Sequence, residues 1–184
     1  MTERLLPGSL NARMAAIGAD LELIRSLRDL HDRQWDLEDR ARSTHAADAD
    51  IVAVKRAIDA SNGERHRLID AIDESLEHHR PRAGGRLWVE TVGELCDRLL
   101  ILELKARRSA QLARDPDLPP DAREGCVRQE LRFRAWRDHL AQGMERLLDD
   151  LMHGLADLPP RSELKMYDVA VLNPVTRMEM RAPH

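Results

Sequence analysis

The sequence predicts an all-α fold, in the form of an antiparallel bundle of four long helices with an ordered C-terminal tail. Apolar residues recur at helical spacing along four long segments, and proline, glycine or capping residues separate them. Aromatic residues make up 3% of the 184 residues and charged residues 34%, which is unusual for a β-rich fold. We therefore expect one domain over residues 1–184, with residues 1–16 as an N-terminal extension and residues 158–184 as a tail packed on the bundle.

The first expected helix runs over Gly18–Ser43, where leucines repeat every seven residues at Leu23, Leu30 and Leu37. A short polar connection leads to a second helix over Asp50–His79. Apolar residues of this helix share one side: Ile51, Val54, Ile58, Ile69, Ile72 and Leu76. Basic residues and then a proline follow, and both favour the end of a helix.

The third expected helix spans Thr91–Arg114 and begins with a capping box formed by Thr91 and Glu94. Its buried stripe consists of Val92, Leu95, Leu99, Leu102 and Ala106. After a turn, the fourth helix begins with a similar pair, Asp121 and Glu124, and ends before two prolines. Its apolar residues are Val127, Leu131, Trp136, Leu140, Met144, Leu147, Leu151 and Leu155.

Composition and charge disfavour several classes of protein. The net charge of -4 argues against a nucleic-acid binder, which would show a basic face. No stretch approaches the roughly 20 apolar residues of a membrane span, and the N-terminus lacks the apolar region of a signal peptide. Cys96 and Cys126 stand alone, without the spacing of a zinc site or a disulfide framework. We therefore expect a cytoplasmic protein that binds neither nucleic acid nor a membrane.

Polar residues stand where the helices should be apolar. His31 and Glu38 follow Ile24 at intervals of seven and so lie on nearly the same face. One face of the second helix carries Lys55, Asp59, Asn62, His66 and Asp73, and the third places Asp97, Arg98 and Lys105 among leucines. Unpaired burial of such groups is costly, so they must pair or face water.

Lysine is rare in this chain, since Lys55, Lys105 and Lys165 are the three lysines among 29 basic residues. A lysine kept against this preference for arginine indicates chemistry that needs a compact, flexible ammonium group.

Structural interpretations of the same residues stay open. An amphipathic surface helix also shows a polar stripe, and His31 is compatible with a core histidine bonded to a neighbour. Asp97 with Arg98 is compatible with a structural ion pair. A metal site from His31, Glu38, Asp59 and His66 is a further alternative, but the chain lacks the Glu-x-x-His and His-Glu-x-x-His motifs. The sequence therefore predicts no metal ligand and identifies no cofactor.

Several motifs resemble one bacterial family, known as domain of unknown function 4254, in the same order and over nearly the whole chain. They are Leu30-His31 with Trp35 and Glu38-Asp39, Val54-Lys55-Arg56-Ala57-Ile58-Asp59 with Asn62 and Arg65, Ile69-Asp70-Ala71-Ile72-Asp73, Glu90-Thr91-x-Gly93 with Asp97-Arg98-Leu99, Ile101-Leu102-x-Leu104-Lys105, Lys165-Met166-Tyr167-Asp168 and Leu172-Asn173-Pro174. The chain departs from the family pattern at Gly63, His66 and Arg67, and after Tyr167. The resemblance implies no established reaction and a loose association with glycan or secondary metabolism.

The rare lysines fall inside these motifs, as does the single tyrosine, and this favours a functional site. We expect a small-molecule enzyme or ligand-binding bundle whose site lies between the first three long helices and takes a phosphate- or carboxylate-bearing ligand. The expected catalytic residues are His31, with Glu38 fixing its tautomer, and Tyr167 reaching in from the tail. The expected substrate-binding residues are Lys55, Asp59, Asn62, Arg65, Asp73, Asp97, Arg98, Lys105 and Lys165.

A second hypothesis is a non-catalytic interaction or dimerisation module, in which buried ion-pair networks fix the register of the helices. Convergence of the motif residues on one open pocket favours the first hypothesis, and scattered ion pairs favour the second. A homodimer is compatible with either.

Overall fold

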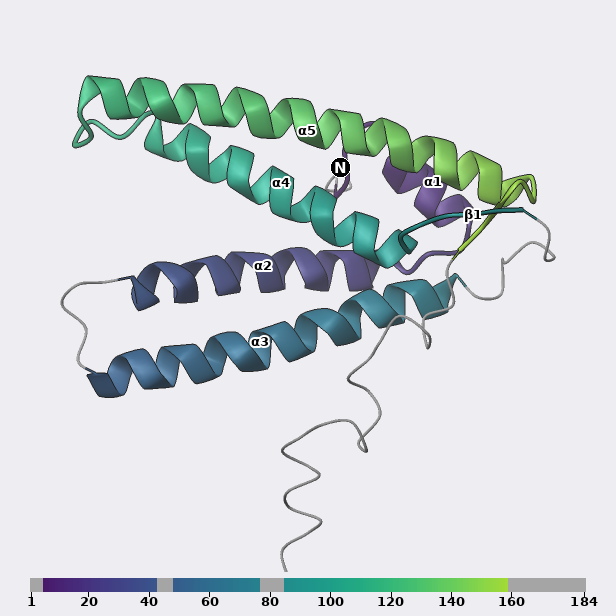
Figure 1. Ribbon diagram of the computed structural model, residues 1–184, viewed down its shortest axis with the longest axis horizontal. Coiled ribbons are helices and arrows are strands. Elements are labelled where there is room, and N and C mark those ends of the chain that lie inside the picture. Colours follow the sequence, from purple (N-terminus) through teal and green to yellow (C-terminus); the bar gives the residue numbers. More distant parts are fainter. Residues whose placement is uncertain (1–4, 43–47, 77–84, 159–184) are drawn as a thin grey trace, which may run out of the picture.

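The computed structural model describes residues 5–42, 48–76 and 85–158, and 78% of these residues are helical (Figure 1). The all-α prediction is therefore confirmed. In chain order, the elements are α1 (Leu10–Ala16), α2 (Leu21–Ala41), α3 (Asp48–Ser75), β1 (Arg86–Leu87), α4 (Val92–Leu112), α5 (Pro120–Met152) and β2 (Ala156–Asp157). Within the described ranges, none of the helices is both long enough and apolar enough to cross a membrane.

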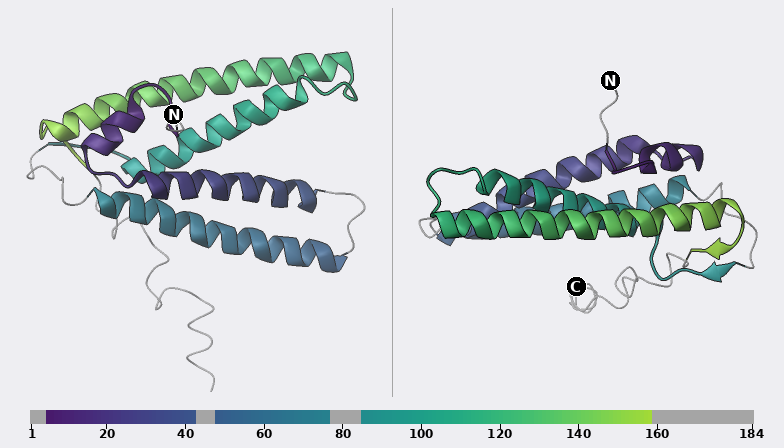
Figure 2. Two further views of the ribbon diagram at one scale, coloured as in Figure 1. Left: turned by 180° about the vertical axis from the view of Figure 1, so that it is seen from behind. Right: turned by 90° about the horizontal axis from the view of Figure 1, so that it is seen from above.

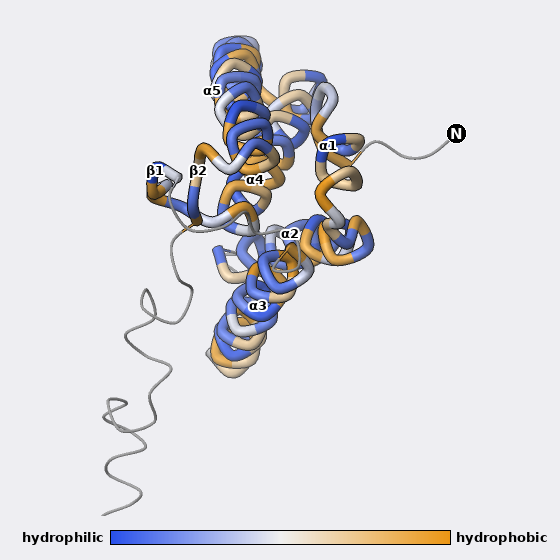
Figure 3. Tube along the Cα trace, turned by 90° about the vertical axis from the view of Figure 1, so that its right-hand side faces the viewer, coloured by the Kyte–Doolittle hydropathy of each residue, from blue (hydrophilic) through white to orange (hydrophobic). Residues whose placement is uncertain are grey.

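The four long helices form two hairpins, α2 with α3 and α4 with α5, each held by extensive contacts (Figures 1 and 2). Both α2 and α3 also contact α4. Figure 3, seen along the helices, shows α5, α4, α2 and α3 following one another across the molecule. The finer expectation of a single antiparallel bundle is not confirmed, because α5 packs on α4, α1 and β2 at one edge of this arrangement.

Local capping explains where α2 and α4 begin. The Asp20 side chain accepts a hydrogen bond of 2.9 Å from the backbone N–H of Glu22. Thr91 and Glu94 form the predicted capping box of α4, in which each side chain accepts a hydrogen bond from the backbone N–H of the other residue. Such contacts satisfy N–H groups that a helix leaves unpaired in its first turn.

Helix α5 begins differently from the prediction. Its first residue is Pro120, and no side chain caps its N-terminus. The expected box from Asp121 and Glu124 is wrong, because a proline at the first helical position lacks an N–H and sets the helical φ angle by itself.

The core is built from Leu, Ile, Val and Met side chains of α1, α2, α3, α4 and α5. Its largest fully buried residues are Leu6, Leu10, Met14, Ile24, Leu27, Leu30, Ile72, Val92, Leu99, Met144, Leu147 and Leu148. The segment over residues 5–16 supplies three of these twelve, so it belongs to the core although the sequence analysis assigned it to an extension. With seven residues, α1 is too short to show a periodic apolar pattern.

We expect Met14→Ala to lower the free energy of unfolding by about 2 kcal/mol, near the lower end for a buried methionine because a short peripheral helix can settle into the space. Val52→Ala, at a position 50% exposed on α3, is the control and should change stability by less than about 0.5 kcal/mol. Urea unfolding of both variants measures the difference. Equal, small effects would show that α1 is not an essential part of the core.

The two short strands join the chain after α5 to the segment before α4. They pair in parallel, with Arg86 opposite Ala156 and Leu87 opposite Asp157. A Cβ at Gly85 would lie 2.6 Å from the carbonyl carbon of Ala156, so this position requires glycine. Figure 3 shows this pair and α1 on opposite sides of the α4–α5 hairpin.

Candidate functional site

Three side chains from three helices meet at the centre of the molecule: His31 from α2, Arg65 from α3 and Asp97 from α4. We call them the His–Asp–Arg triad. Nε2 of His31 lies 2.9 Å from Oδ1 of Asp97. Arg65 donates two hydrogen bonds to the same carboxylate, from Nε to Oδ1 at 2.7 Å and from Nη2 to Oδ2 at 2.5 Å. His31 and Asp97 are 5% and 3% exposed, so the carboxylate is held almost without water.

The electrostatic balance keeps Asp97 ionised. Burial alone raises the pKa of its carboxyl group, because it disfavours the charged form, but the hydrogen bonds from Arg65 and His31 act in the opposite direction and the net pKa is lowered. The pKa of Arg65 is raised, chiefly by its hydrogen bond to Asp97. An ionised carboxylate only accepts hydrogen bonds, so Nε2 of His31 carries the proton and Nδ1 is left with a lone pair when the ring is neutral.

Asp73, on α3, binds the N-terminus of α4. Its Oδ1 accepts a hydrogen bond of 2.7 Å from the backbone N–H of Gly93, where a negative charge also suits the helix dipole. A Cβ at Gly93 would lie 2.5 Å from the carbonyl oxygen of Ile69, so only glycine allows α3 and α4 to approach this closely. The close approach brings Arg65 within reach of Asp97. It also leaves Cys96 fully buried, where desolvation and the nearby Asp73 and Asp97 charges raise the pKa of the thiol.

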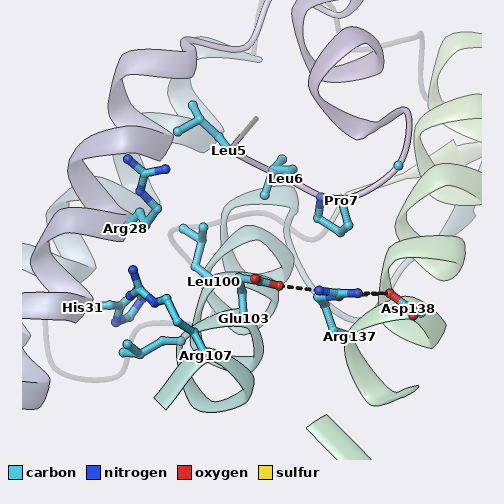
Figure 4. A pocket seen from close by; sticks show the side chains of 12 residues that line it. Leu5, Leu6, Pro7, Arg28, His31, Leu100, Glu103, Arg107, Arg137 and Asp138 are labelled. Atoms are coloured by element: carbon cyan, nitrogen blue, oxygen red, sulfur yellow. Dashed lines mark hydrogen bonds and ion pairs between the residues drawn. The ribbon is translucent and has the colours of Figure 1, made fainter. Parts of the chain in front are cut away.

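Two pockets lie beside the triad: His31 lines the first, and Arg65 and Asp97 line the second. The first, which we call the arginine pocket, has a volume of about 410 Å³ and lies between α2, α4, α5 and residues 5–8 (Figure 4). Its polar lining residues are Arg28, His31, Glu103, Arg107, Arg137 and Asp138. The second, which we call the α3–α4 pocket, has a volume of about 310 Å³. It is lined by Arg65, His66, Ile69, Asp70, Asp73, Thr91, Glu94, Asp97, Arg98 and Ile101.

Ion pairs fix one wall of the arginine pocket. Arg137 donates to Glu103 at 2.5 Å and to Asp138 at 2.7 Å, which joins α5 to α4 (Figure 4). Burial lowers the pKa of Arg137, but these two carboxylates outweigh it and the net pKa is raised. On the other side of the pocket lie Arg28, His31 and Arg107. The triad therefore presents its imidazole to a pocket rich in guanidinium groups.

Glu38 does not hold the imidazole as the sequence analysis expected. It forms an ion pair of 3.1 Å with Arg42 near the end of α2. Seven residues along a helix correspond to about 10 Å of rise, so a shared face does not bring Glu38 within hydrogen-bonding distance of His31. Asp97, from another helix, takes that place.

The predicted substrate-binding residues divide into two groups. Arg65, Asp73, Asp97 and Arg98 line the α3–α4 pocket, although the Arg65 guanidinium is occupied by Asp97 and Arg98 pairs with Glu90 at 2.6 Å. Lys55, Asp59, Asn62 and Lys105 line neither pocket. Lys55 and Asp59 are exposed on α3, and Asn62 accepts a hydrogen bond from Gln34. Lys105 lies over the Phe133 ring, with 5.7 Å between its Nζ and the ring centroid. Lys165 and Tyr167 lie outside the described residues.

The sequence alone does not single out Arg28, Arg107 and Arg137 as site residues. Arg28 stands three residues before His31, and such a spacing puts two side chains on neighbouring positions of one helix face. In a chain with 29 basic residues, nearly all arginine, this signal does not stand out. The side chains meet only because α2, α4 and α5 converge. Within the part of the chain that the structure describes, no group of three His, Cys, Asp or Glu side chains is arranged to hold a metal ion.

One protein-family model matches most of the chain. The model of the family described as "Protein of unknown function (DUF4254)" matches residues 21–159. This range contains α2 to β2 and so includes all three members of the triad. No curated protein and no solved structure matches the chain significantly.

Proposed function

We propose that this chain, which belongs to the DUF4254 family, is a small-molecule enzyme. In this proposal, His31 exchanges a proton with an anionic substrate that is bound in the arginine pocket. One observation carries this proposal: a buried imidazole, held by a buried ionised carboxylate, lines a pocket that also contains three arginines. The family name leaves the reaction open, so the chemistry has to come from the site.

The triad supports a role in proton transfer. A carboxylate on one ring nitrogen fixes the tautomer and orientation of an imidazole and stabilises the imidazolium that forms when the ring takes up a proton. With Nε2 held by Asp97, Nδ1 is the ring atom left for a ligand. Arg65 keeps Asp97 ionised and in place, so it acts as a positioning residue and not as a ligand for the substrate.

The non-catalytic hypothesis remains the competing proposal and has its own support. Lys55 and Asp59 lie away from both pockets, and Arg98 is paired at the surface with Glu90. A buried pair such as Arg65 with Asp97 can also serve only to fix the register of three helices. The two hypotheses differ in what His31 does, because a structural network needs a hydrogen bond at Nε2 but makes no use of Nδ1.

We expect His31→Gln to abolish turnover while leaving the fold nearly intact. The glutamine amide can still donate a hydrogen bond to Asp97, but it cannot accept and return a proton near neutral pH. Anionic metabolites that raise the melting temperature of the wild-type protein would be incubated with both proteins, and conversion followed by NMR. We expect a loss of at least about 100-fold in turnover, the low end for removal of a general acid–base group.

Gln34→Ala is the matched control on the same helix, since Gln34 bonds to Asn62 and lines neither pocket. It should retain turnover. A substrate converted equally by the wild type and by His31→Gln would refute a catalytic role for His31, and so would a complete absence of stabilising anions.

The proposal also covers the cellular location of the protein and its binding partners. We propose a cytoplasmic, bacterial protein, because Cys96 and Cys126 are both free thiols and the motifs of the chain resemble those of a bacterial family. A small anionic molecule is its ligand, with no nucleic acid among its partners. A homodimer is compatible with the exposed apolar side chains of Val127 and Leu131 on α5.

A further inference from the structure

The three arginines of the arginine pocket are not equivalent. Arg137 is the least exposed, at 16% of its side chain, and two carboxylates hold it. Arg107 is 46% exposed and pairs with Asp32, which is itself partly exposed. An ion pair at such a position contributes little to stability, so a ligand can replace its carboxylate at low cost. Arg28 lies on α2 one helical turn before His31 and lines the same pocket, where its Nε lies 3.6 Å from Oδ1 of the exposed Asp29.

We infer that Arg28 and Arg107 bind the phosphate group of a phosphorylated small molecule beside His31, while Arg137 and Glu103 form a fixed wall. This assignment rests on the proposed function, since it names the substrate class of the same site. It differs from the sequence-based expectation, in which the basic substrate-binding residues were Lys55, Arg65, Arg98, Lys105 and Lys165.

The geometry favours phosphate over carboxylate. Arg28 and Arg107 come from different helices, α2 and α4, and reach the pocket with His31 on the same side (Figure 4). One guanidinium fork already satisfies both oxygens of a carboxylate. A terminal phosphate offers three oxygens and up to two negative charges, so it can engage two guanidinium groups and an imidazole together.

The walls of the pocket limit the rest of the ligand. Leu5, Leu6 and Leu100 add apolar lining beside the charged groups, and the pocket volume of about 410 Å³ admits a ligand of small-metabolite size. The ligand that fits is therefore a small phosphate monoester with an apolar or weakly polar body, and not a polyphosphate, whose charge would meet Glu103 and Asp138.

Arg107 and its sequence neighbour Arg108 provide a matched pair of variants. Both lie on α4 and both pair with an aspartate of α2, Arg107 with Asp32 and Arg108 with Asp36 at 2.7 Å. Arg107 lines the arginine pocket, whereas Arg108 lies over Trp35 on another part of the surface. Loss of charge and loss of an α2–α4 ion pair are thus common to both variants, but Arg107 alone lines the arginine pocket.

The test measures binding of phenyl phosphate, benzoate and inorganic phosphate by calorimetry at constant ionic strength. We expect phenyl phosphate to bind the wild type at least roughly tenfold more tightly than benzoate, with inorganic phosphate competing for the site. Arg107→Gln and Arg28→Gln should each weaken phenyl phosphate binding roughly tenfold or more, and Arg108→Gln should leave it unchanged.

Equal binding of benzoate and phenyl phosphate would overturn the phosphate assignment, as would equal losses in Arg107→Gln and Arg108→Gln. Absence of phenyl phosphate binding to the wild type would overturn it as well. If Arg107→Gln fails to fold, as judged by far-UV circular dichroism, Arg28→Gln alone carries the comparison with Arg108→Gln. Because the assay measures binding without turnover, phosphate binding with normal turnover in His31→Gln would refute the proposed catalysis and leave the binding site standing.

Discussion

Asp97→Ala is expected to lower the free energy of unfolding by about 3–4 kcal/mol at neutral pH. The change removes the carboxylate that accepts hydrogen bonds from Arg65 and His31, and it leaves a buried imidazole and a half-buried guanidinium without their partner. Breaking a buried ion pair by removing one partner typically has a cost of about 3–5 kcal/mol, and the partial exposure of Arg65 reduces it here. Urea unfolding followed by circular dichroism measures the effect.

The neighbouring Arg98→Ala is the control, since Arg98 is 60% exposed and pairs with Glu90 at the surface. We expect this variant to lose less than about 1 kcal/mol. Similar losses in the two variants would mean that the triad is no more important to folding than a surface ion pair.

The pH dependence gives a second check on Asp97. Its pKa is lower in the folded protein than in the unfolded chain, so the unfolded state binds the proton more readily. The stability that the carboxylate contributes is therefore fully present above the unfolded pKa and is lost as pH falls through the lower, folded pKa. The stability difference between the wild type and Asp97→Asn should be constant around neutral pH and shrink only in strongly acidic solution. A difference that grows on acidification would contradict this sign.

Gly93→Ala is expected to lower the free energy of unfolding by about 3 kcal/mol, the upper part of the range for overpacking a well-packed interior. The added Cβ would lie 2.5 Å from the carbonyl oxygen of Ile69 and 3.0 Å from Oδ2 of Asp73. The first of these atoms belongs to the backbone of α3, so the clash can be relieved only if α3 and α4 move apart. That movement would also draw Arg65 away from Asp97, and we expect weaker ligand binding as well as lower stability.

Gly143→Ala provides the opposite result from the same chemical change. No atom lies within 4 Å of a Cβ at Gly143 on α5, and alanine has a higher helix propensity. We expect it to raise stability by roughly 0.5–1 kcal/mol. A stabilised Gly93→Ala variant would show that α3 and α4 do not pack as closely as described.

The sequence by itself determined the four long helices, because local rules dominate there. Apolar spacing placed α2, α3 and α4 within a few residues of their observed bounds, and the Thr91 capping box marks the start of α4 as expected. The expected fourth helix included Leu155, whereas α5 ends at Met152. Within the motif Glu90-Thr91-x-Gly93, Thr91 meets a local demand, the cap of α4, whereas Gly93 meets a tertiary one, the close approach of α3.

The composition of the site was partly foreseen as well. His31 and Asp97 stand out because polar groups among apolar residues must find partners, whereas Arg65 stands out only as part of a motif that resembles the family. Their mutual pairing was not foreseen, and the alignment of His31 with Glu38 suggested the wrong carboxylate. A spacing of seven reports a shared face but not the roughly 10 Å that separates the two residues along the helix.

Only the tertiary structure decided which helices meet and what lies between them. Helical periodicity tells which face of each helix is buried, but it carries no information about the neighbour on that face. The joining of two hairpins through α4 therefore could not be read from the pattern, nor could the packing of residues 5–16 into the core. The arginine pocket depends on the way the helices meet and on the packing of the N-terminal segment. Arg28, Arg107 and Arg137 come from three helices, and residues 5–8 line the same pocket.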